Sequence, residues 1–186
     1  MAIHHIQTPL TDEVIAKLRA GDQVLLSGVI YTARDAAHKR LVALIEQGEE
    51  LPIDLRNQVI YYAGPCPPKP GQVIGPNAPT TAYRMDPFAP TMFAYGVKGT
   101  IGKGPRTEPV KQACVEHRAI HFSAVGGMSA LLAKRVKKVE TVAYEDLRTE
   151  AIRAFTIEDF PLLVTYDMYG GDIYEQEIKK YKNYTG

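Results

Sequence analysis

Cysteine, net charge and long apolar runs are all scarce in this 186-residue sequence. The two cysteines, Cys66 and Cys114, form no CxxC pair. They cannot supply the three or four thiolates of an iron–sulfur cluster or a cysteine-rich zinc site. The sequence shows no signal peptide and no apolar run near the length of a membrane span. We therefore expect a cytoplasmic protein with reduced thiols and no membrane contact.

Charge of one sign is not in excess either. Lys and Arg number 22, Asp and Glu number 21, and the net charge is +1. Nucleic-acid binders usually carry a basic excess, so a nucleic-acid partner is not expected. No two of the five histidines have metal-ligand spacing beside an acidic residue, so no metal site is expected in this chain.

The sequence contains enough apolar residues, 45%, to build a real core. Helical and strand-like segments alternate rather than segregate, which predicts one α/β domain over residues 1–186. Residues 1–10 would form an N-terminal arm, and residues 175–186 a charged tail that frays or docks on a partner. We expect strands at 24–31, 58–62, 120–125, 136–143 and 161–166. We expect helices at 11–21, 35–48, 129–134 and 144–154, with Thr11 and Asp35 as N-caps.

A proline-rich segment interrupts this order. Eight of the thirteen prolines lie between residues 64 and 90, in a stretch that includes GPNAPTTAYRMDP. A loop this long is normally either disordered or functional, and proline stiffening favours function. Arg84 can clamp a carboxylate, and Thr80 and Thr81 offer hydroxyls. The alternative is that the threonines are ordinary turn hydroxyls and that Asp86 is a turn residue.

The junction YTARDAAHKR joins an expected strand to an expected helix. Unpaired backbone N–H groups and the helix dipole make such a helix start attractive to anions. Arg34 adds a planar fork for a carboxylate there. Asp35 and His38 would support Arg34 in this role. The alternative is that Asp35 only caps the helix, His38 packs or hydrogen-bonds locally, and Arg34 is solvated.

A third segment, YGVKGTIGKG, is rich in glycine and carries two lysines. Glycine lets a backbone approach a ligand closely, and Lys103 between two glycines is the more suggestive cation. The spacing does not fit a Walker loop, and a flexible hairpin is an equally good interpretation. Arg34, Arg84 and Lys103 together suit a small dicarboxylate, but no group suited to redox or Lewis-acid chemistry accompanies them. The sequence therefore indicates half of an active site.

Several motifs in series resemble one family. LSGVIYTARDAAHKR, YYAGPCP, GPNAPTTAYRMDPF, TIGKG, KKVETVAYEDL and EDFPLLVTYD are similar to the β subunits of class I iron–sulfur fumarate hydratases and of L(+)-tartrate dehydratases. The resemblance runs from about residue 11 to residue 174. It departs at Tyr83, where a small residue is expected, and at Arg153, where relatives often have tryptophan.

The resemblance implies a swivelling β/β/α fold with a mixed sheet, in a hydro-lyase of the tricarboxylic acid cycle. A partner α subunit would carry the [4Fe-4S] cluster, whose open iron acts as a Lewis acid, and this chain would bind no cofactor. Matched by motif, Thr80 and Lys103 would be catalytic, and Arg34 and Arg84 would bind the substrate carboxylates. Thr81 would also bind substrate. Asp35, His38 and Asp86 would support these residues from behind without touching the substrate.

The main hypothesis is thus a β subunit that hydrates fumarate to (S)-malate only with its α subunit. A tartrate dehydratase or methylfumarate hydratase β subunit keeps the mechanism and changes the substrate. A non-catalytic dicarboxylate-binding domain is the alternative from another class. The sequence leaves open whether the isolated chain forms a homodimer.

Overall fold

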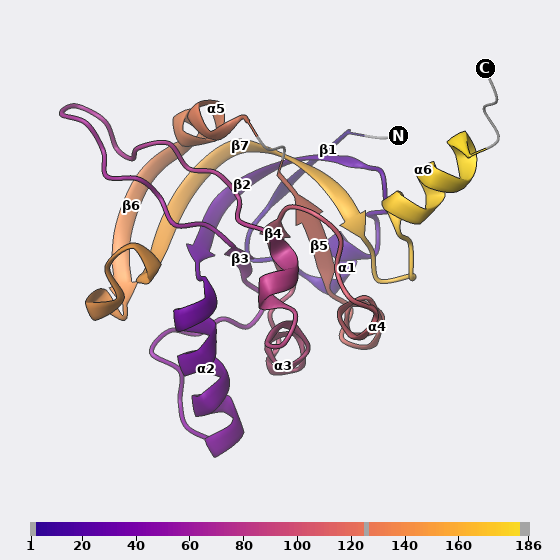
Figure 1. Cartoon of the computed structure of the whole chain (residues 1–186), viewed down its shortest axis with the longest axis horizontal. Coiled ribbons are helices and arrows are strands. Elements are labelled where there is room, and N and C mark those ends of the chain that lie inside the picture. Colours follow the sequence, from indigo (N-terminus) through magenta and orange to yellow (C-terminus); the bar gives the residue numbers. More distant parts are fainter. Residues whose placement is uncertain (1–2, 125–126, 183–186) are drawn as a thin grey trace.

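A run of parallel strands forms the centre of the fold, and one long antiparallel strand closes it into a barrel (Figure 1). The computed structural model describes residues 3–124 and 127–182. The strands around the barrel are β2 (Gln23–Thr32), β3 (Val59–Tyr61), β4 (Gly99–Gly102), β5 (Ile120–Ser123) and β7 (Ile152–Tyr166). The first four are parallel, and β7 runs antiparallel to β5 and β2. The predicted α/β class with a mixed sheet is confirmed.

Two further strands extend the sheet. β1 (Ile3–Gln7) pairs in parallel with the first half of β2, so these residues of the expected arm belong to the sheet. β6 (Val136–Ala143) pairs antiparallel with β7 and forms an outer edge.

The helices are mostly short. They are α1 (Asp12–Ile15), α2 (Asp35–Gln47), η1 (Ala82–Met85), α3 (Ala89–Tyr95), α4 (Glu108–Glu116), α5 (Ser129–Arg135), η2 (Glu145–Glu150) and α6 (Ile173–Tyr181). Helices α2, α3 and α4 connect successive parallel strands and lie together on one side of the sheet (Figure 1). Parallel neighbours require such crossovers. Among the described residues, no helix has the length and apolar character needed to cross a bilayer.

Strand β3 shows how the sequence divides the core in two. Side chains alternate between the faces of a strand, so Val59 and Tyr61 enter one hydrophobic cluster and Ile60 and Tyr62 the other. The first cluster fills the barrel, where Tyr61 meets Phe160 at 5.5 Å between ring centroids. The second lies between the barrel and the helices. The strand is therefore buried on both faces, and its carboxyl end leads directly into the proline-rich loop.

Helix α2 buries an apolar stripe that includes Ala37, Leu41 and Val42. The prediction that Asp35 caps it is wrong. Arg34 is the N-cap residue, in extended backbone and without a side-chain capping bond, and Asp35 is the first helical residue. Gly48 ends the helix in the left-handed conformation, with φ of 72°.

Other boundaries also differ from expectation. The segment at 144–154 is not one helix, because the short η2 ends at Glu150 and β7 begins at Ile152. That strand extends far beyond the expected 161–166. Helix α1 covers only Asp12–Ile15, although Thr11 does cap it. Strand β5 ends at Ser123, and the expected strand end at residue 125 lies outside the described residues. Helices α3, α4 and α6 were not predicted, and α6 (Ile173–Tyr181) occupies much of the expected charged tail.

Candidate functional site

The three segments singled out in the sequence follow the carboxyl ends of three adjacent parallel strands. Arg34 comes after β2, the loop to Thr81 comes after β3, and Lys103 comes directly after β4. Carboxyl ends of parallel strands meet at one edge of the sheet, which is where α/β proteins commonly place ligands. The topology therefore brings together residues that are up to 69 positions apart.

Thr80 and Thr81 lie against Lys103 through main-chain hydrogen bonds. The Thr80 N–H donates to the Tyr62 carbonyl at 2.7 Å, and the Lys103 N–H donates to the Thr80 carbonyl at 3.3 Å. The Ala82 N–H then donates to the Lys103 carbonyl at 2.8 Å, which completes a short parallel bridge between Thr81 and Lys103. The lysine segment is thus not a flexible hairpin: its residues Gly99–Gly102 form the buried strand β4.

The Thr80 side chain is half-buried, and its hydroxyl makes no hydrogen bond with another residue in the described part of the chain. The Lys103 side chain is exposed, and among the described residues it joins no ion pair. Both groups therefore remain available to a ligand at this edge.

A second group of site residues is held by ion pairs. Arg84, on η1, donates from Nε to Asp35 Oδ1 at 3.2 Å and from Nη2 to Asp35 Oδ2 at 2.9 Å. Arg34 Nη2 lies 3.9 Å from the same carboxylate, and Arg34 Nε lies 3.3 Å from Glu150 Oε1. One carboxylate at the start of α2 thus stands between two guanidinium groups. Arg34 is 25% exposed and Arg84 is 41% exposed, so both can reach solvent.

Space beside this cluster is open. A hollow of about 500 Å³ is lined by Asp35, Ala36, Lys39, Arg84, Pro87, Phe88 and Glu150. Neither Lys39 nor Glu150 was among the predicted site residues. Glu150 lies 115 positions beyond Asp35 in a segment expected to be helical, so no local pattern pointed to it.

Gly64 leaves room for Arg34 at the start of the proline-rich loop. A Cβ atom on Gly64 would lie 3.0 Å from Arg34 Nη1 and 3.4 Å from the Thr149 carbonyl. The glycine is therefore a packing requirement of the arginine side chain.

His38 supports Arg34 from inside the fold. Its ring is fully buried, against Tyr62 at 5.4 Å and Phe88 at 5.9 Å between centroids. Burial lowers the pKa of His38 to about 4, although the contact with the Arg34 carbonyl opposes the shift. The ring is neutral at pH 7, and Nδ1 donates to that carbonyl at 2.9 Å. His38 thus fixes the backbone of Arg34 at the helix start.

Asp86 is also buried, and it is more than a turn residue. Its carboxylate accepts from the Thr107 N–H at 2.6 Å and from Arg106 Nε at 2.5 Å. Arg106 is a buried cation that sequence reasoning missed, since nothing in its local pattern distinguishes it from a surface arginine.

The structure thus brings the predicted residues into two groups, the Thr80–Thr81–Lys103 group and the Arg34–Asp35–Arg84 group, joined by η1.

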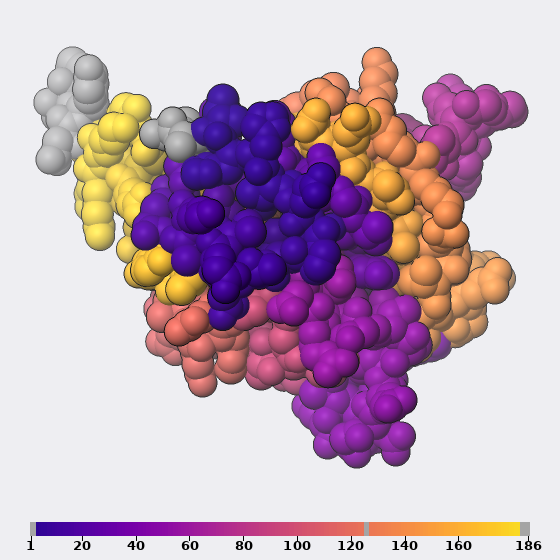
Figure 2. Space-filling view, turned by 180° about the vertical axis from the view of Figure 1, so that it is seen from behind, coloured from indigo at the N-terminus to yellow at the C-terminus, as the bar shows by residue number. Residues whose placement is uncertain are grey.

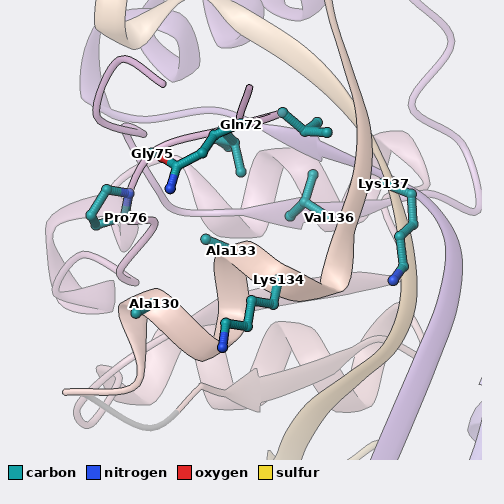
Figure 3. Close-up of a pocket in the computed structure, with 10 residues that line it drawn as sticks. Gln72, Gly75, Pro76, Ala130, Ala133, Lys134, Val136 and Lys137 are labelled. Atoms are coloured by element: carbon teal, nitrogen blue, oxygen red, sulfur yellow. The ribbon is translucent and has the colours of Figure 1, made fainter. Parts of the chain in front are cut away.

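A separate hollow of about 430 Å³ lies elsewhere, between residues 72–76 of the proline-rich loop, α5 and β6 (Figure 3). None of the eight predicted residues lines it. The tip of the loop projects from the body of the molecule in the space-filling view (Figure 2).

The described residues do not fit a bound cluster. No three His, Cys, Asp or Glu side chains converge as metal ligands in residues 3–124 and 127–182. Cys66 is exposed in the proline-rich loop, whereas Cys114 is buried in α4, where burial raises the pKa of its thiol to about 12. A thiol held protonated in this way is a poor metal ligand.

Sequence comparison decides the family. The model described as "Fumarase C-terminus" matches residues 2–177. The chain belongs to this family. Among similar members, "Fumarate hydratase class I, anaerobic" from Escherichia coli is 36% identical over 173 residues, 90% of this chain. "Fumarate hydratase 2" from Leishmania major is 34% identical over 166 residues, 88% of this chain.

Members of the fumarase C-terminus family differ in length. This chain spans 32% of the Escherichia coli protein and 29% of the Leishmania major protein. In contrast, it spans 91% of "Putative L(+)-tartrate dehydratase subunit beta" from Methanocaldococcus jannaschii, with 35% identity over 177 residues. The same unit therefore occurs both within a longer chain and as a short one, which confirms the resemblance seen in the sequence.

Proposed function

We propose that this chain is the β subunit of an iron–sulfur hydro-lyase that reversibly hydrates fumarate to (S)-malate. A partner α subunit would carry the [4Fe-4S] cluster, and this chain would bind none. The main support is the meeting of Thr80, Lys103 and the paired arginines at one edge of the parallel strands. The family membership and the small share of the longer fumarate hydratases that the chain spans support the need for a partner.

The two arginines would bind the substrate carboxylates. Asp35 occupies Nε and Nη2 of Arg84, so Nη1 remains free to donate to a substrate carboxylate while the fork keeps its orientation. Arg34 is held more loosely, by ion pairs with Glu150 at 3.3 Å and Asp35 at 3.9 Å, and within the described residues its Nε makes no hydrogen bond. The dipole at the start of α2 adds to the attraction for an anion.

Thr80 would move the proton at the substrate carbon, and Thr81 would bind substrate beside it. An isolated hydroxyl keeps its proton far above neutral pH, so Thr80 needs an activating base. No described residue accepts a hydrogen bond from it, and a carboxylate from the α subunit would fill that role. Lys103 would stabilise the negative charge that develops in the transition state.

The chain would be the swivelling β/β/α unit, one domain over residues 1–186, that closes over substrate held by the α subunit. It would act in the cytoplasm, within the tricarboxylic acid cycle. Whether the isolated chain forms a homodimer is decided by its sedimentation behaviour.

Tartrate is the second candidate substrate, because a relative of nearly equal length is named for tartrate. Methylfumarate is the third. Anaerobic reconstitution with the α subunit and assay of fumarate, L(+)-tartrate and methylfumarate would rank them by kcat/KM. A higher kcat/KM for fumarate than for the other two acids would support the proposal. Saturable dicarboxylate binding by the isolated chain, with no turnover by the complex, would favour a non-catalytic binding domain instead.

A further inference from the structure

A buried arginine ties together the two segments that carry the candidate catalytic residues. The side chain of Arg106 is 0% exposed and that of Asp86 is 6% exposed. Arg106 Nε donates to Asp86 Oδ1 at 2.5 Å, and the Arg106 main-chain N–H donates to the Tyr166 hydroxyl at 3.0 Å. The arginine is thus anchored through both its side chain and its backbone.

His121 holds the other side of the same guanidinium. Arg106 Nη1 lies 3.1 Å from His121 Nδ1, and Thr100 Oγ1 lies 2.8 Å from that nitrogen. A guanidinium can only donate, so Nδ1 is the acceptor and the ring proton is on Nε2. Burial keeps the pKa of His121 well below its usual value, which is consistent with a neutral acceptor. The ring is stacked on Tyr166 at 5.9 Å.

Two sets of contacts tie the segments together. The first is the main-chain pairing of Thr80 and Ala82 with Lys103. The second is the Asp86–Arg106 pair, which lies a few residues further along: Asp86 follows η1, and Arg106 follows Lys103 by three positions. Two separated ties fix the relative orientation of two segments, whereas one would leave a hinge.

We propose that Arg106 is a positioning residue that, through Asp86, sets Thr80 against Lys103 for the hydration reaction. This role rests on the function proposed above. It predicts a selective loss of kcat. The Arg84 side chain has its own two bonds to Asp35 on α2, which would keep it placed to bind substrate when the tie to Arg106 is weakened. Misplacing reacting groups by about 1 Å can cost roughly 10²-fold in rate.

The test uses the chain reconstituted anaerobically with its α subunit. In Asp86→Asn and Arg106→Lys, kcat for fumarate should fall by at least about tenfold while KM changes by less than about threefold. Arg106→Lys keeps the charge, and should retain more activity than Arg106→Met. The matched control is Arg56→Lys, because Arg56 makes a similar two-bond pair with Asp54 at an exposed site, and its kcat should be unchanged.

Thermal unfolding identifies any variant that has lost its fold, and Arg106→Lys is the milder change if Asp86→Asn does not fold. A folded Arg106→Lys enzyme with wild-type kcat would overturn the proposal, as would equal losses in the lysine and methionine variants. Amide hydrogen exchange over residues 80–86 of the isolated chain is independent of activity, and should be faster in the variants. If the wild-type complex is inactive, unchanged exchange would still refute the tie and faster exchange would support it.

Discussion

The carboxylate of Asp35 accepts two hydrogen bonds from Arg84, at 3.2 and 2.9 Å, across 49 positions of sequence. This pair joins the first turn of α2 to the proline-rich segment. It gives the acidic residue at this helix start a role that is compatible with the proposed anion site: the carboxylate orients the arginine. The Arg84 and Asp35 side chains are 41% and 34% exposed. Solvent therefore screens the pair, which should add about 1 kcal/mol or less to the stability of the fold.

Arg84→Lys should therefore lower activity far more than stability. The fork is lost although the charge remains, and we expect kcat/KM for the reconstituted enzyme to fall by about 10- to 100-fold. The thermal midpoint should change little. Arg56→Lys, which breaks an exposed pair outside the site, is the control. Equal kcat/KM for the Arg84 variant and wild type would mean that Arg84 does not bind substrate.

Thr80→Ala should abolish most turnover. Loss of a positioned proton-transfer group typically costs about 10²–10⁴-fold in rate. The main-chain bonds of Thr80 to Tyr62 and Lys103 remain in this variant, so the fold and the assembly with the α subunit should be retained.

Thr80→Ser is the matched control, because it keeps the hydroxyl. It should recover much of the activity in steady-state assays. A fully active alanine variant would exclude Thr80 from the chemistry.

Gly64→Ala should weaken substrate binding through Arg34. The added Cβ would lie 3.0 Å from Arg34 Nη1, so the guanidinium must shift. We expect KM to rise and kcat to change less. Gly71→Ala is the control for a general disturbance of the loop. Gly71 lies in the same loop, and a Cβ there would strain the backbone at φ of +80° but would meet no atom within 4 Å. A KM increase in the Gly71 variant as large as in the Gly64 variant would contradict this reading.

Acid should destabilise the chain through His38. Its pKa is about 4 in the folded state and 6.5 for the free side chain, so the unfolded chain binds the extra proton between these values. Stability from this group is full above pH 6.5 and is lost as the pH falls toward 4, by about 3 kcal/mol. His121 acts in the same direction.

His38→Gln keeps a donor for the Arg34 carbonyl but does not titrate. Its unfolding free energy, measured in urea at pH 7 and pH 4.5, should depend less on pH than that of the wild type. An identical pH dependence would mean that His38 is not the titrating group.

The sequence singled out the segments of the candidate site, but it did not predict the contacts between them. Arg34, Thr80 and Lys103 were recognisable because each stands in an irregular segment after an apolar run. Their convergence follows from parallel strand order, which local pattern alone does not reveal. Asp35 was misplaced as a cap because the capping rule favours a short polar residue, whereas Arg34 occupies that position without a side-chain bond.

Long-range partners were the residues that escaped prediction. Glu150 and Arg106 reach the site across the fold, and each resembles a surface charge in its own neighbourhood. The Gly-rich stretch was open to interpretation as a hairpin because glycine weakens a strand signal. In the structure, a Cβ on Gly99 or Gly102 would lie within about 3 Å of neighbouring side chains, so the glycines permit close packing of β4.

The most direct measurement compares fumarate hydration by this chain alone, by the α subunit alone, and by the two mixed anaerobically. We expect (S)-malate formation at enzymatic rates only in the mixture, with the iron of the cluster recovered on the α subunit. Comparable turnover by the isolated, iron-free chain would contradict it.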